Sequence, residues 1–84
     1  MDEIEKQRKE IDKIDSQLVK LLEKRWNAAR KIGKAKRKKG LEYYDQERED
    51  QILEKVSGKT KLEKEFIREI FSKIMEYCRN GEKE

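Results

Sequence analysis

The sequence contains no histidine and no proline, and its single cysteine is Cys78. Without histidine, a Ser-His-Asp triad and a Cys-His nucleophile pair are excluded. One cysteine cannot form an intrachain disulfide, and no Cys/His pattern is present to bind a metal. The lone cysteine fits a reducing compartment, so we expect a cytoplasmic protein.

Long apolar runs are missing as well, since 33% of the 84 residues are hydrophobic and 50% are charged. No stretch approaches the roughly 18 apolar residues of a membrane span, and the opening "MDEIEKQRKE" lacks the apolar middle of a signal peptide. We therefore expect no membrane contact. A chain this short and polar buries only a small core, which favours oligomerisation.

Apolar residues recur at three- and four-residue steps, which is typical of helices. No stretch alternates apolar and polar residues as a half-buried strand would. The first helix is expected from a cap at Asp2 to Gly40, and the second begins near Asp45 and breaks at Gly58. The pattern predicts an all-α fold of long, short and medium helices.

The third helix is expected to follow a capping box formed by Thr60 and Glu63. The "RNG" segment at 79–81 is typical of a helix stop, so we expect the helix to end there. Residues 1–84 are expected to form one domain.

Charged residues interrupt the apolar faces of the first two helices. At 100° per residue, Arg25 and Lys36 fall on the apolar stripe of the first helix, and Arg8 does the same nearer its start. Asp45 and Glu49 share a face with apolar residues of the second helix. Because unpaired buried charge is costly, three inward bases facing two inward acids predict a small dianionic ligand.

These residues lie in "RKEIDKIDSQLVKLLEKR", "IGKAK" and "YYDQERE", and with this spacing the chain resembles the AroQ class of all-helical chorismate mutases over essentially its whole length. The resemblance implies an isomerase of aromatic amino acid biosynthesis, which rearranges chorismate to prephenate without a cofactor. It also implies an intertwined homodimer whose two pockets are shared between chains.

The resemblance further implies a role for each pocket residue. Arg8 from the partner chain and Arg25 would bind the substrate carboxylates, and Lys36 would donate to the ether oxygen. Glu49 would accept from the ring hydroxyl, assisted by the backbone at Asp45 and Arg48.

Two positions depart from the family pattern. Cys78 aligns with a serine or asparagine and is expected to line the pocket wall, because a thiol is a weak donor. Glu82 aligns with a glutamine or glutamate; it must be protonated to donate to the ether oxygen, so activity is expected to fall as pH rises. Glu82 is thus a candidate catalytic and substrate-binding residue. Gly81 is expected to end the helix just before it, which leaves open whether its side chain points into the pocket or away from it. Gly33 suggests a close helix approach or room for substrate, and Trp26 suggests dimer packing.

Three alternatives remain open from the sequence. An isochorismate pyruvate lyase has the same fold and a similar pocket. A basic helical dimer binding nucleic acid would lose affinity with salt, but its basic segment lacks interleaved aromatic residues. A plain structural coiled coil would bind no small dianion. The candidate nucleic-acid contacts are Lys31, Lys34, Arg37, Lys38 and Lys39.

Overall fold

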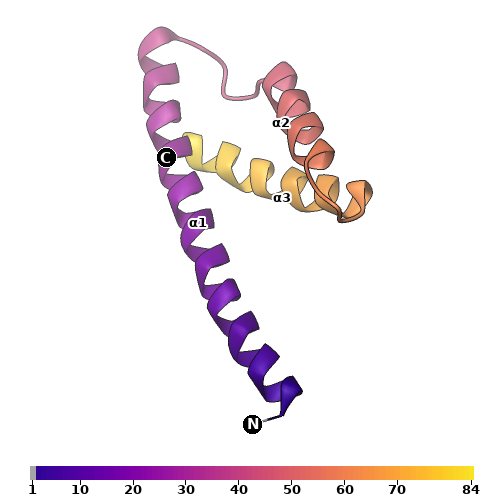
Figure 1. Ribbon diagram of the computed structural model, residues 1–84. Helices are drawn as coiled ribbons and strands as arrows, with labels where there is room; N and C mark the ends of the chain where they lie inside the picture. The colour runs from indigo at the N-terminus through magenta and orange to yellow at the C-terminus, as the bar shows by residue number, and fades with distance from the viewer. Residues whose placement is uncertain (1) are drawn as a thin grey trace.

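The computed structural model describes residues 2–84, which form three helices (Figure 1). Helix α1 spans Glu3–Lys39, α2 spans Gln46–Gly58 and α3 spans Lys64–Glu82. The all-α prediction of long, short and medium helices is confirmed. Within residues 2–84, none of these helices combines the length and the apolar character needed to cross a membrane.

Both ends of α1 are set by the residues that the sequence indicated. Asp2 Oδ1 accepts a hydrogen bond from the backbone N–H of Glu5 at 2.8 Å. At the other end Gly40 adopts a left-handed conformation with φ of 69°, and the N–H of Leu41 donates to the carbonyl of Lys36 at 2.9 Å. This is a Schellman motif, which a residue with a side chain would adopt only with strain.

Helix α2 begins after Asp45, whose Oδ1 accepts from the N–H of Arg48 at 3.0 Å, as expected of a helix cap. The predicted capping box of α3 is wrong. Thr60 Oγ1 accepts from the N–H of Leu62 at 3.0 Å, so Thr60 closes a local turn and α3 begins later, at Lys64.

The predicted helix stop at 79–81 is also wrong, because α3 continues to Glu82. Gly81 serves close packing instead: a Cβ at this position would lie 2.5 Å from Nε1 of Trp26. Trp26 therefore packs on Gly81 of its own chain, and its place at a dimer interface stays a prediction. Gly33 has a similar reason, since its Cβ would lie 2.0 Å from the carbonyl oxygen of Glu82.

Helix α3 crosses the carboxyl-terminal half of α1 and packs against both α1 and α2 (Figure 1). The amino-terminal half of α1 projects beyond the other helices. The molecule measures 57 × 25 × 15 Å, and its radius of gyration is 16.2 Å. A compact chain of this length would have a radius of gyration of about 12 Å.

The core of this single chain is small. Its buried apolar residues are Ala29, Met75 and Cys78. The accessible surface is 7276 Å², against about 5300 Å² for a typical folded monomer of this mass. Much of the excess is apolar surface along α1, where the large exposed side chains are Ile4, Ile11, Ile14, Leu18, Val19, Leu21, Leu22 and Ile32.

Candidate active site

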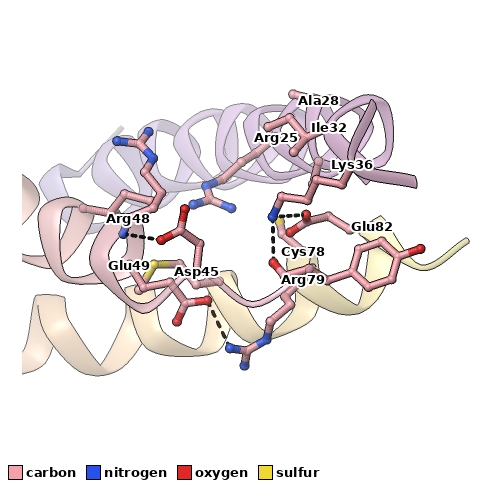
Figure 2. Close-up of a pocket in the computed structure, with 14 residues that line it drawn as sticks. Arg25, Ala28, Ile32, Lys36, Asp45, Arg48, Glu49, Cys78, Arg79 and Glu82 are labelled. Atoms are coloured by element: carbon pink, nitrogen blue, oxygen red, sulfur yellow. Dashed lines mark hydrogen bonds and ion pairs between the residues drawn. The ribbon is translucent and has the colours of Figure 1, made fainter. Parts of the chain in front are cut away.

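An open pocket of about 380 Å³ lies between the second half of α1, the start of α2 and the end of α3. It contains seven of the eight residues predicted to form the site. These are Arg25, Lys36, Asp45, Arg48, Glu49, Cys78 and Glu82 (Figure 2).

Lys36 enters the pocket from the last turn of α1, and its side chain is 17% exposed. Its Nζ donates to the backbone carbonyl of Tyr43 at 2.6 Å. The same Nζ lies 2.7 Å from Oε1 of Glu82. An ammonium group has three N–H donors. One of them is used in the hydrogen bond to Tyr43, and Glu82 is an ion-pair partner, so at least one donor remains for a ligand.

Glu82 reaches the pocket because α3 continues past Gly81. The side chain of Glu82 is 12% exposed. Arg37 holds the surrounding backbone, since its guanidinium donates to the carbonyls of Glu82 at 2.9 Å and Glu84 at 3.3 Å. Arg37, which the sequence offered as a candidate nucleic-acid contact, thus links the ends of α1 and α3.

The opposite side of the pocket comes from the first turn of α2. Asp45 lines the pocket while it caps α2, and Arg48 and Glu49 follow it. Glu49 Oε2 accepts from Nη1 of Arg79 at 3.0 Å. Sequence reasoning missed Arg79, although it lies one helical turn before Glu82 and so shares its face of α3.

Arg25 projects into the pocket from the same side of α1 as Lys36 (Figure 2). Within residues 2–84 its guanidinium forms no ion pair, so it is available to an anion. Cys78 is buried and lines the wall, as expected. The remaining wall is mainly apolar and includes Ala28, Ala29, Ile32, Ile52 and Met75.

Arg8 lies outside this pocket. It is exposed on α1 and pairs with Glu5 at 3.0 Å. Arg8 and Arg25 are 17 positions apart in the same helix, which places them about 25 Å apart along α1. An arginine side chain cannot span that length, so a role for Arg8 requires the pocket of a second chain.

The pocket combines charge with a partly apolar wall. Four cationic side chains line it, from Arg25, Lys36, Arg48 and Arg79, against three carboxylates, from Asp45, Glu49 and Glu82. One positive charge is therefore left over from a single chain. Such a site suits a small anion whose ring contacts the apolar wall while its charged groups meet the cations.

Comparisons with known proteins agree with this geometry. The family model of chorismate mutase type II matches residues 7–83. A bifunctional chorismate mutase/prephenate dehydratase of Aquifex aeolicus is 35% identical over 99% of this chain. The chain spans 25% of the length of that relative.

Solved structures give the same result. The chain resembles form II of chorismate mutase from Thermus thermophilus, with a TM-score of 0.92 and 28% identity over 96% of this chain and 94% of that one. A conserved hypothetical protein from Pyrococcus furiosus has a TM-score of 0.82 and 38% identity, with 95% of each chain covered. The predicted resemblance is thereby confirmed, and the chain belongs to the chorismate mutase type II family.

Proposed function

We propose that this chain rearranges chorismate to prephenate, and that residues 1–84 act as one chorismate mutase domain. The observation that carries the proposal is the placement of Lys36, whose part-buried ammonium keeps one donor free in a pocket that also presents Arg25. Chorismate is a dicarboxylate, and its charges match cations at these positions.

The reaction is a concerted rearrangement with no nucleophile, so the protein needs to hold the substrate in its reactive conformer. Arg25 supplies a planar guanidinium that binds a carboxylate through two hydrogen bonds. Lys36 donates to the ether oxygen, where negative charge develops as the C–O bond breaks. Its hydrogen bond to Tyr43 and its ion pair with Glu82 hold the ammonium in the pocket.

Glu49 accepts a hydrogen bond from the ring hydroxyl in this proposal, because an ionised carboxylate is an acceptor. Asp45 caps the first turn of α2 by accepting from the N–H of Arg48, and Glu49 lies in that turn. Glu82 lies against Lys36 and therefore beside the ether oxygen. Glu82 assists only when protonated, since an ionised carboxylate has no proton to donate.

The active form in this proposal is a homodimer in which Arg8 of one chain completes the pocket of the other. Two observations support it: the amino-terminal half of α1 projects alone with exposed apolar side chains, and Arg8 cannot reach its own pocket. Arg8 adds a fifth cationic side chain to a pocket whose cations already outnumber its carboxyl groups, which suits a dicarboxylate.

A substrate assay tests the proposed activity. Purified protein is incubated with chorismate while substrate loss is followed by ultraviolet absorbance, and the product is identified as prephenate. Isochorismate is assayed in parallel, because a pyruvate lyase of the same fold would consume it and release pyruvate. Conversion of isochorismate alone would contradict the proposal and favour the lyase.

A further inference from the structure

Arg79 enters the candidate active site from α3, between Cys78 and Glu82, and its side chain is 22% exposed. Nη1 of Arg79 donates to Oε2 of Glu49 at 3.0 Å, as the lower dashed line in Figure 2 shows. The other side of the guanidinium rests on Tyr44, with its central carbon 4.5 Å from the ring centroid. The hydroxyl of Tyr44 in turn bonds the side-chain oxygen of Gln46.

We propose that Arg79 is a positioning residue that sets the orientation and the effective charge of Glu49 for substrate recognition. The inference rests on the proposed function, because it assumes that Glu49 accepts from the ring hydroxyl. Within residues 2–84, the carboxylate of Glu49 has Arg79 as its hydrogen-bond partner through Oε2, and Oε1 remains open to a ligand.

The first effect of Arg79 is on charge. A carboxylate in a pocket for a dianion repels the substrate, and the repulsion is strong where water screens it poorly. Glu49 is only 21% exposed, so its charge is poorly screened. The guanidinium of Arg79 offsets this charge at 3.0 Å, which lets the pocket keep an acceptor without excluding a dicarboxylate.

The second effect is on orientation. A glutamate side chain has several rotamers, and a hydrogen bond to a fixed donor removes most of them. Arg79 is itself fixed, since its planar group stacks on Tyr44. Glu49 is therefore held by a donor from a different helix, and Oε1 keeps one direction during the reaction.

The two effects separate in two variants. Arg79→Lys keeps the positive charge but loses the planar group that stacks on Tyr44 and the directed N–H. We expect KM within about twofold of the wild type and kcat lower by about 10-fold, the scale of one lost charge-assisted hydrogen bond. Arg79→Met loses both effects, so KM rises by about 10-fold as well.

A double-substitution cycle shows whether Arg79 acts through Glu49. In a Glu49→Ala background, Arg79→Met should change kcat/KM by less than about threefold, because the side chain that it orients is gone. Arg68→Met is the matched control, since Arg68 is an exposed arginine of the same helix outside the pocket. It should leave KM and kcat unchanged.

The experiment is steady-state kinetics with chorismate on the wild type, both Arg79 variants, the control and the cycle, with thermal unfolding recorded for each. If the wild type is active and the KM and kcat of Arg79→Met stay within twofold of its values, the inference is overturned while the proposed function stands. The inference is also overturned if Arg79→Met keeps its full effect in the Glu49→Ala background. A wild type that leaves chorismate unconverted would overturn the proposed function together with the inference.

Discussion

The ammonium of Lys36 lies 2.7 Å from the carboxyl group of Glu82, so the proposed electrostatic catalyst is paired with an acid inside its own pocket. Substrate must insert its ether oxygen beside this pair. An ionised Glu82 would repel the electrons of that oxygen, whereas a protonated Glu82 would donate to it.

Glu82→Gln tests whether a hydrogen-bond donor beside Lys36 assists the reaction. The amide of glutamine carries an N–H donor and no negative charge, so kcat/KM should rise several-fold above the wild-type value. Steady-state kinetics with chorismate at one pH check this, and an unchanged or lower kcat/KM would exclude a donor role at this position.

Gly33→Ala should damage the site by moving α3. The new Cβ would lie 2.0 Å from the carbonyl oxygen of Glu82, and backbone cannot yield as a flexible side chain can. We expect a stability loss of about 1 to 3 kcal/mol, as for other overpacked sites, together with a lower kcat. Urea unfolding and steady-state kinetics measure the two effects.

Gly58→Ala is the control for this substitution. Nothing lies within 4 Å of a Cβ built on Gly58, at the end of α2. Stability should stay the same or rise by up to about 1 kcal/mol, because alanine favours helix. Equal losses from both substitutions would show that the contact between Gly33 and Glu82 is not the cause.

Arg37→Met tests the link between the ends of α1 and α3. Loss of the Arg37 guanidinium leaves the carbonyls of Glu82 and Glu84 without their charged donor. It also removes a hydrogen bond to the hydroxyl of Tyr43 at 3.3 Å. We expect a stability loss of about 1 kcal/mol, since these bonds are exposed to water, and a several-fold lower kcat. Lys38→Met, at an exposed neighbour, should change neither quantity.

Leu18→Glu tests the proposed dimer. Leu18 is 53% exposed on the apolar stripe of α1, where a second chain would cover it. A buried unpaired charge at an interface should dissociate the dimer and lower activity at low protein concentration. Sedimentation and dilution assays check this. Lys20→Glu, on the opposite face of the helix, should remain dimeric, and a monomeric wild type would contradict the proposal.

Local signals accounted for most of the fold. Asp2, Gly40 and Asp45 satisfy backbone groups of their own or neighbouring turns, so the residue type is enough to place the helix end. Gly81 misled the prediction because its role is tertiary: it admits Trp26 and lets α3 continue. A glycine that ends a helix and one that allows close packing look the same in sequence.

The residues of the candidate site also fall into those that the sequence could predict and those that it could not. Arg25 and Lys36 stood out because they lie on an apolar stripe, and both line the pocket. Arg79 did not stand out, because the polar side of α3 offers no contrast to a charged residue. Its partner Glu49 comes from α2, 30 positions earlier in the chain, and only the packing of α2 on α3 brings them together.

The kcat of Lys36→Ala with chorismate tests the central claim most directly. Lys36 is the cationic donor that the proposal assigns to the ether oxygen. Its loss should lower kcat by at least about 100-fold. Lys34→Ala, at an exposed position two residues earlier, should keep the wild-type value. Near-normal turnover by a folded Lys36→Ala protein would contradict the account.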